Sequence, residues 1–298
     1  MGYLNMIVKP LYGKNGWMFL DGDNNKTIEQ MTGKLLLSDD QLKAWDELLY
    51  ARTNFFTKRN IDYIYICAPN KESVYRNLLP DWYKPSYFTP INQITPIFEK
   101  HLDHRFVFPL ETLTGNTIDT YTLGDTHWNQ YGAYKCFLEL EKIHDRIGTL
   151  GDVKFVDRSL TGDLGRKIDS SYVEIQPVAS FSKSTFNIEF DNKISNRGRV
   201  IIFNNPDAPI KKNVVFFRDS FGSQLLHFFA RAYSRVVAIW QPNIDFSIIE
   251  LEKPDLVISE QVERFLISPP SDSDTPSVEE LVLSKNKNAP LYYANKNI

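Results

Sequence analysis

A serine occupies the junction between an apolar strand and an amphipathic helix in the last third of the chain. Residues 214–217 are typical of a buried strand, residues 222–233 of a helix, and Ser220 lies between them. In parallel α/β sheets, reactive groups collect at the carboxyl ends of strands, where a serine projects into a crevice. The first N–H groups of the following helix would point at an oxyanion formed on the substrate. A plain helix N-cap made by Asp219 or Ser220 is the alternative interpretation.

An Asp-x-His motif is the second candidate for chemistry. Asp125 and His127 follow a predicted strand and directly precede a predicted helix. A carboxylate at this spacing can accept the Nδ1 proton, fix the imidazole tautomer and leave Nε2 free as a base. The alternatives are a capping aspartate beside a structural histidine and, less favoured, a metal site, for which neither cysteine is placed to complete the ligand set. With Ser220, the motif predicts a Ser-His-Asp acyl-transfer site.

The elements that must position these motifs alternate between strands and helices. Ser38 begins a capping-box pattern, and apolar residues follow at helical spacing up to Phe56. Another helix is predicted from about Gln130 to Ile147, with Asn129 as its N-cap. Continuous apolar, β-branched and aromatic runs, typical of buried parallel strands, occur at residues 61–68, 105–110, 214–217, 236–240 and 254–258. The pattern predicts an α/β fold with a mainly parallel sheet flanked by helices.

Two segments depart from this pattern. Residues 160–210 alternate polar and apolar side chains between Asn, Gly and Asp turns, which predicts antiparallel β-hairpins inserted beside the main sheet. The stretch SPPSDSDTPS, which begins at residue 268, has the composition of a linker. We therefore expect one domain over residues 1–268, followed by a linker and a loosely attached tail over residues 269–298.

The composition limits the classes of partner and compartment. The net charge of -3 arises from interspersed charges without a basic block, so no nucleic-acid partner is expected. No apolar run approaches the ~20 residues of a membrane span, and the first residues lack the pattern of a signal peptide. Cys67 and Cys136 lie in apolar surroundings, which are typical of buried free thiols. These features predict a cytoplasmic protein, or a periplasmic one if a targeting segment has been removed.

The motifs in combination resemble a known family. Asp125-Thr126-His127-Trp128 with Asn129 and Gly132, followed by Asp219-Ser220-Phe221, is similar to the SGNH hydrolase-like domain of alginate O-acetyltransferases of the AlgX/AlgJ type. Three other stretches agree, namely GKNGWMFL at residues 13–20, Pro69-Asn70-Lys71 with Val74-Tyr75 and Leu79-Pro80, and Gly162-Asp163-Leu164. The resemblance covers roughly residues 10–268. Because SGNH hydrolases usually present the serine first, a histidine 93 residues before the serine implies a circularly permuted domain.

The resemblance implies an O-acetyltransferase that uses no metal or organic cofactor. Ser220 would take an acetyl group from a donor, with His127 as general base and Asp125 as its orienting acid. The acyl-enzyme would pass the acetyl group to a hydroxyl of a polysaccharide or oligosaccharide acceptor. A carbohydrate esterase with the same triad is the first alternative, because water can replace the sugar hydroxyl. A noncatalytic carbohydrate-binding module is disfavoured because all three triad residues are present.

The remaining substrate contacts are less sharply defined. By the same resemblance, residues 254–261 occupy the strand that normally delivers an oxyanion-hole asparagine, but no asparagine stands there. The backbone N–H of Ser220 is therefore the first oxyanion donor to consider, with Gln241 and Gln261 as weaker candidates. Arg218 could bind a sugar carboxylate, although a surface ion pair with Glu or Asp is favoured. Lys71 could contact substrate, although a surface or capping lysine is favoured because lysine is seldom buried.

Overall fold

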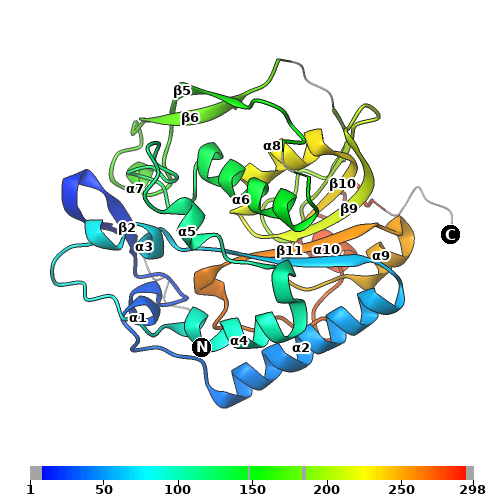
Figure 1. The fold of residues 1–298 in the computed structure, drawn as a ribbon, viewed down its shortest axis with the longest axis horizontal. Helices are drawn as coiled ribbons and strands as arrows, with labels where there is room; N and C mark the ends of the chain where they lie inside the picture. The colour runs from blue at the N-terminus through cyan, green and yellow to red at the C-terminus, as the bar shows by residue number, and fades with distance from the viewer. Residues whose placement is uncertain (1–8, 147, 183–185, 293–298) are drawn as a thin grey trace.

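One seven-stranded sheet forms the centre of the molecule, and helices cover both of its faces (Figure 1). The computed structural model describes residues 9–146, 148–182 and 186–292. The strands follow the order β4 (Phe106–Val107), β3 (Asp62–Ala68), β11 (Leu256–Val262), β9 (Ile210–Arg218), β10 (Tyr233–Trp240), β8 (Val200–Asn204) and β7 (Asn187–Asp191). The first five strands in this order are parallel, whereas β8 and β7 are antiparallel to their neighbours.

Successive side chains of the strands point to opposite faces of the sheet, and each face carries a hydrophobic core. Ile64, Phe216 and Ala238 belong to one core, while their sequence neighbours in the same strands belong to the other. The first core packs against α6 (Gln130–Ile143) and α8 (Gly222–Ala232), and the second against α2 (Asp39–Lys58), α4 (Pro90–Leu102), α9 (Phe246–Glu252) and α10 (Val278–Lys285). Each buried Ile or Phe side chain stabilises the fold by about 1.5–3 kcal/mol, so this two-sided burial makes the strands rigid supports.

Short elements complete the chain. The short helices are α1 (Thr27–Met31), α3 (Lys71–Val74), α5 (Leu110–Leu113) and α7 (Gly165–Ile168), with 3₁₀ turns at Lys14–Gly16, Arg76–Leu78, Asp103–Arg105 and Glu263–Phe265. An N-terminal hairpin pairs β1 (Lys9–Tyr12) with β2 (Met18–Asp21), and a second ribbon pairs β5 (Lys154–Leu160) with β6 (Glu174–Ser180).

The predicted α/β architecture is confirmed. The strands expected at residues 61–68, 254–258, 214–217 and 236–240 are neighbours as β3, β11, β9 and β10, all parallel. The capping box at Ser38 is present, and Asn129 caps α6 by accepting from the N–H of Gly132 at 2.9 Å. Helix α6 ends at Ile143, earlier than expected, and Ile147 lies outside the described residues.

Two predicted strand regions differ in detail. The run at residues 105–110 forms only the two-residue strand β4, since Pro109 has no N–H to donate and the chain turns into α5. The expected hairpin region divides into two parts. Strands β5 and β6 form a separate ribbon that begins at residue 154, whereas β7 and β8 join the main sheet.

The expectation of a loosely attached tail is wrong for residues 269–292. Val278 and Val282 of α10 are buried in the second core. Asp272 accepts from Arg52 Nη2 at 2.7 Å, and the Arg52 side chain is fully buried. Composition misled the prediction because two valines at helical spacing and one buried ion pair are enough to dock a polar segment. The domain boundary at residue 268 stays a prediction.

Two sequence expectations concern cysteines and membrane spans. Cys67 and Cys136 are buried free thiols, as predicted. Within the described residues, no helix combines the length and the apolar character that crossing a bilayer requires.

Candidate active site

The structure brings Ser220, His127 and Asp125 together in one hydrogen-bonded row. His127 Nε2 lies 2.8 Å from Ser220 Oγ, and His127 Nδ1 lies 2.7 Å from Asp125 Oδ1. Because Asp125 is acceptor-only when ionised, Nδ1 carries the proton and Nε2 is left as the acceptor for the serine hydroxyl. This is the arrangement by which a serine becomes a nucleophile.

Ser220 lies in the turn between β9 and α8. The ring of Phe221, which is fully buried, packs 4.8 Å from the His127 ring, centroid to centroid. Trp128 donates its indole N–H to the Phe221 carbonyl at 2.9 Å. The segment that carries Ser220 and the segment that carries His127 therefore pack against each other through aromatic side chains.

Two carboxyl groups brace the turn that carries the serine. Asp219 accepts from the N–H of Phe221 and from the N–H of Val262, both at 2.7 Å. Glu260 Oε2 accepts from the N–H of Asp219 at 3.1 Å and of Gly222 at 3.0 Å. Burial and the neighbouring Asp219 charge raise the pKa of Glu260 well above its usual range, which favours the neutral form of this carboxyl.

These bonds change the expected oxyanion site. The N–H groups of Phe221 and Gly222 already bond to carboxyl oxygens, so they are not free to meet an oxyanion. The Ser220 N–H makes no hydrogen bond to any described residue and stays available. The capping alternative applies to Asp219 alone, because the Ser220 hydroxyl bonds to His127 and caps no N–H group.

Asp125 has both carboxylate oxygens engaged. Oδ1 accepts from the backbone N–H and from Nδ1 of His127, each at 2.7 Å, and Oδ2 accepts from the N–H of Asp163 at 3.2 Å. Burial disfavours the imidazolium, but the hydrogen bond and charge of Asp125 outweigh burial and raise the pKa of His127. Burial opposes ionisation of Asp125 too, yet the bond to His127 holds the pKa of Asp125 below its usual value. The pair is thus built to stabilise a proton on His127.

The loop around Asp125 is not preceded by a strand, contrary to the prediction. An isolated bridge pairs Tyr121 with Trp128, so residues 122–127 form a closed loop. Lys71, which is 1% exposed, donates from Nζ to the carbonyls of Met18, Leu123 and Asp125 at 2.7, 2.8 and 3.0 Å. Burial lowers the pKa of Lys71 to about 8. Lys71 is therefore neither a surface lysine nor a substrate contact, because its three donors hold the loop.

Glu174 and the turn that begins at Gly162 support the same loop. Glu174 accepts from the N–H of Gly124 at 3.0 Å and from the Thr122 hydroxyl at 2.9 Å. The Gly124 carbonyl accepts from the N–H groups of Leu164 and Gly165. A Cβ at Gly162 would lie 2.1 Å from that carbonyl oxygen, so only glycine permits this approach. Sequence reasoning missed Glu174, and it recorded Gly162-Asp163-Leu164 as a motif without giving it a role.

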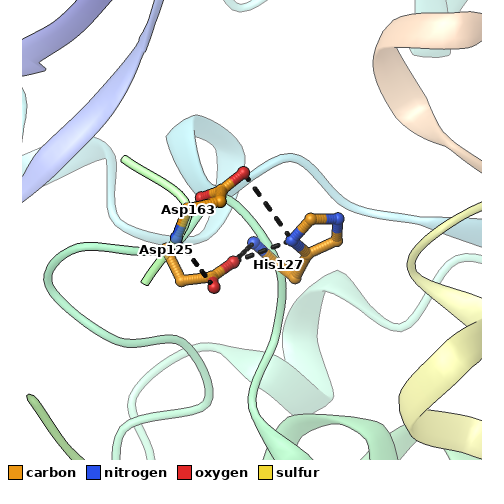
Figure 2. A group of neighbouring side chains, drawn as sticks. All are labelled: Asp125, His127 and Asp163. Atoms are coloured by element: carbon orange, nitrogen blue, oxygen red, sulfur yellow. Dashed lines mark hydrogen bonds and ion pairs between the residues drawn. The ribbon is translucent and has the colours of Figure 1, made fainter. Parts of the chain in front are cut away.

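Asp163 is a second carboxylate beside His127 (Figure 2). Its Oδ2 lies 3.9 Å from His127 Nδ1. Ligand atoms of Asp125, His127 and Asp163 all lie within 4.8 Å of one another, so the structure supplies the third metal-ligating group that the sequence motif lacked. A cation there would have to replace the Nδ1 proton shared with Asp125. The bonds at both ring nitrogens of His127 favour proton transfer over metal binding.

Ser220 and His127 open into a cleft of about 890 Å³. Its walls include Arg218 and Trp240 from the ends of two neighbouring strands, Gln261 from the end of β11, and Arg197 from the turn between β7 and β8. The segment of residues 268–271 and Thr275 also line this cleft. A smaller polar pocket of about 230 Å³, lined by Gln176, Ser223 and Gln224, lies on another side of the same serine and histidine.

The two glutamines proposed as oxyanion donors differ in position. Gln261 lines the cleft, and its Oε1 accepts from the Tyr65 hydroxyl at 2.5 Å. This bond turns Nε2 away from Tyr65, and Nε2 bonds to no described residue. Gln241 does not line the cleft, and its Nε2 is used by the Asn243 carbonyl at 3.1 Å. Gln241 is therefore a wrong prediction as an oxyanion donor.

Arg218 is buried in the cleft wall and makes no surface ion pair, so the favoured prediction for it is wrong. Its Nη1 donates to the Asp219 carbonyl at 2.8 Å and to the Ser223 hydroxyl at 2.9 Å. The guanidinium lies 4.6 Å from the Trp240 ring centroid. Burial lowers the pKa of Arg218 to about 10, so it is still a cation at pH 7. Nε is buried without a partner among the described residues, and Nη2 bonds to none of them, which leaves the N–H groups of Nη2 for a ligand.

The backbone is similar to solved structures that include those of the following three proteins. PatB1 of Bacillus cereus aligns with a TM-score of 0.60 at 14% identity, over 87% of this chain and 97% of that chain. The O-acetyltransferase domain of Pseudomonas putida AlgJ aligns with a TM-score of 0.55 at 14% identity, over 93% and 100%. Pseudomonas aeruginosa AlgX aligns with a TM-score of 0.50 at 12% identity, over 93% and 70%. These likenesses confirm the predicted AlgX/AlgJ-type fold, while neither family models nor curated protein sequences give a match.

Proposed function

We propose that this chain is a serine-dependent O-acetyltransferase that moves an acetyl group through Ser220 to a hydroxyl of a polysaccharide or oligosaccharide. The observation that carries the proposal is the unbroken row of hydrogen bonds from Asp125 through His127 to Ser220, which ends in an open cleft. A noncatalytic binding module would have no need of a serine hydroxyl aimed at the unprotonated ring nitrogen of a histidine.

The reaction proceeds in two steps. In the first, Ser220 Oγ attacks the acetyl carbonyl carbon while His127 Nε2 takes the hydroxyl proton. The bond between the carbonyl carbon and the donor's leaving group breaks, and His127 returns the proton to that group. In the second, His127 deprotonates a sugar hydroxyl, whose oxygen attacks the carbonyl carbon of the acetyl-serine. The bond from that carbon to Ser220 Oγ breaks, and His127 returns the proton to Oγ. Asp125 stabilises the imidazolium in both steps.

The oxyanion of each tetrahedral intermediate needs two donors. The free N–H of Ser220 supplies one. Gln261 supplies the other through Nε2, because Tyr65 holds Oε1 and Gln261 lines the same cleft as Ser220. The bond from the Val262 N–H to Asp219 fixes this end of β11 against the serine turn, so the donor is held in place before substrate arrives.

The cleft supports a sugar chain as the acceptor. A volume of about 890 Å³ falls within the range of sites for drug-sized ligands and far exceeds what an acetyl group needs. Trp240 offers an aromatic ring and Arg218 an unspent donor in the cleft wall. The likeness to the AlgJ O-acetyltransferase domain agrees with this assignment.

An esterase is the second candidate, and the smaller polar pocket favours it. Its volume of about 230 Å³ is ample for water beside His127. Water activated by His127 would release acetate from the acyl-enzyme, and the triad would serve equally well. The two functions differ only in which nucleophile reaches the acetyl-serine.

Incubation with an activated acetyl ester, with and without glycan acceptors, tests the proposal. We expect mass spectrometry to find acetyl on Ser220 and then on the glycan, and Ser220→Ala to lose more than about 10³-fold in turnover. Ser284→Ala, at an exposed position of α10, is the serine control. Retention of more than about a tenth of the turnover in Ser220→Ala would overturn the nucleophile assignment. Free acetate that no acceptor suppresses would instead select the esterase.

A further inference from the structure

We infer that Asp163 is a second carboxylate of the acid–base machinery, a positioning residue that holds the Asp125–His127 loop and stabilises positive charge on His127 from the side opposite Ser220. The inference rests on the proposed function for its catalytic meaning, but its electrostatic part concerns His127 alone. It adds a fourth residue to the three that the sequence identified.

Asp163 is fixed although its side chain is 40% exposed. Its Oδ1 accepts from the Thr126 N–H at 2.7 Å, and its Oδ2 accepts from the Thr126 hydroxyl at 2.7 Å. Thr126 stands between Asp125 and His127 in the chain, so these two bonds grip the centre of the Asp-x-His motif. A surface carboxylate without a positioning role would not have both oxygens bonded to the loop of residues 122–127.

The backbone around Asp163 also donates hydrogen bonds to the loop that carries Asp125. The Asp163 N–H donates to Asp125 Oδ2 at 3.2 Å, which leaves Oδ1 of Asp125 for His127 (Figure 2). The N–H groups of Leu164 and Gly165 donate to the Gly124 carbonyl at 2.9 and 3.0 Å. Backbone hydrogen bonds therefore hold this turn in place without help from the Asp163 side chain. The carboxylate is thus kept near His127 by the turn itself.

The distance decides how Asp163 acts. At 3.9 Å, Oδ2 is too far from His127 Nδ1 for a hydrogen bond, and the Thr126 hydroxyl lies closer to Nδ1, at 3.3 Å. Asp163 therefore works through its charge, whereas Asp125 works through a direct bond. Partial exposure weakens this charge by solvent screening, so its influence is smaller than that of Asp125.

Other charged groups around His127 also influence its pKa. Arg264, from the turn after β11, opposes the imidazolium. Arg218 and Asp219, from the serine turn, line the same cleft as His127. Lys71 lies behind the loop and bonds to the Asp125 carbonyl. Unlike these groups, Asp163 combines a negative charge with a place beside Nδ1, where it adds to the charge of Asp125, so removing it should lower the His127 pKa.

The test replaces Asp163 by Asn, which keeps an acceptor for the Thr126 N–H and removes the charge. With a small activated acetyl ester, the acid limb of kcat/KM reports neutral His127 in the free enzyme. We expect this limb to move to lower pH by about 0.5 unit, the plateau of kcat to fall about three- to tenfold, and KM to stay unchanged. Asp169→Asn, an exposed carboxylate a few residues onward, is the matched control and should change nothing.

Direct titration keeps the inference separate from the proposed function. The chain has five histidines, so NMR can follow the His127 ring in wild type and in Asp163→Asn whether or not an acyl-enzyme forms. If Asp163→Asn does not fold, Asp163→Ser gives the same comparison. An unchanged His127 pKa with lost activity would reduce Asp163 to a structural role and overturn the inference. Loss of activity in a chelator with recovery on adding a divalent cation would overturn it in favour of a metal ligand.

Discussion

Ser220 and His127 reach the same cleft on segments that are built differently. Ser220 lies on a short turn between β9 and α8, both of which are buried in a hydrophobic core. His127 lies at the end of the loop of residues 122–127, which belongs to no strand or helix and is closed by a single bridge. One half of the site thus takes its position from the sheet, and the other from polar contacts.

The polar contacts of the His127 loop come from segments far apart in the sequence. Lys71 follows β3, Asp163 precedes α7, Glu174 begins β6, and the Met18 carbonyl that Lys71 also holds lies in the N-terminal hairpin. The serine turn instead finds its braces, Asp219 and Glu260, in the turn itself and in the adjacent strand β11. Removing one polar side chain should therefore displace the loop that carries His127 more than removing one brace displaces the turn that carries Ser220.

Gln261 gives the largest expected effect and tests the sheet-held half. Gln261→Ala should lower kcat about 10²–10³-fold with little change in KM, because it removes a donor that acts on the transition state. The free energy of unfolding should fall by about 1–3 kcal/mol, since the change leaves the buried Tyr65 hydroxyl without the acceptor it now uses. Steady-state kinetics and chemical denaturation measure the two quantities. Gln241→Ala is the matched control, and equal losses in both variants would remove Gln261 from the oxyanion site.

Lys71 tests the loop-held half, with a smaller effect on rate and a larger one on stability. Lys71→Met should remove a donor from three carbonyls, of which Leu123 keeps the Met18 N–H, lowering kcat about 10–100-fold and the free energy of unfolding by about 3 kcal/mol. Lys14→Met, which removes an exposed ion pair with Asp81, is the control and should change stability by less than about 1 kcal/mol. Full activity in Lys71→Met would show that the loop holds its shape without this contact.

The same comparison explains what the sequence could reveal. The serine turn was predictable because its position follows from local patterns, an apolar strand, a serine and an amphipathic helix, and strand ends meet at one edge. Asp125 and His127 were predictable because the motif carries its own chemistry at a spacing of two. The resemblance added their pairing with Ser220 across 93 residues, which no local pattern could give.

The residues that support the His127 loop could not be predicted from the sequence, for a physical reason. A buried lysine that binds only backbone carbonyls leaves no partner of opposite charge in the sequence, so Lys71 was predicted at the surface. Glu174 lies in a strand of alternating residues and resembles any exposed glutamate. The tail was misjudged in the same way, because the partner of Asp272 is Arg52, 220 residues away.

The smallest expected effect comes from changing Glu260 to Gln, which sharpens the account of the serine turn. Because burial raises the pKa of Glu260 and favours its neutral form, an amide of the same shape should accept from the N–H groups of Asp219 and Gly222 equally well. We expect kcat to change less than about threefold and stability by less than about 1 kcal/mol. Glu260→Ala, which strands both N–H groups, should cost about 2–4 kcal/mol. A tenfold loss of kcat in Glu260→Gln would mean that the carboxyl is ionised and that its charge, not its shape, holds Ser220 in place.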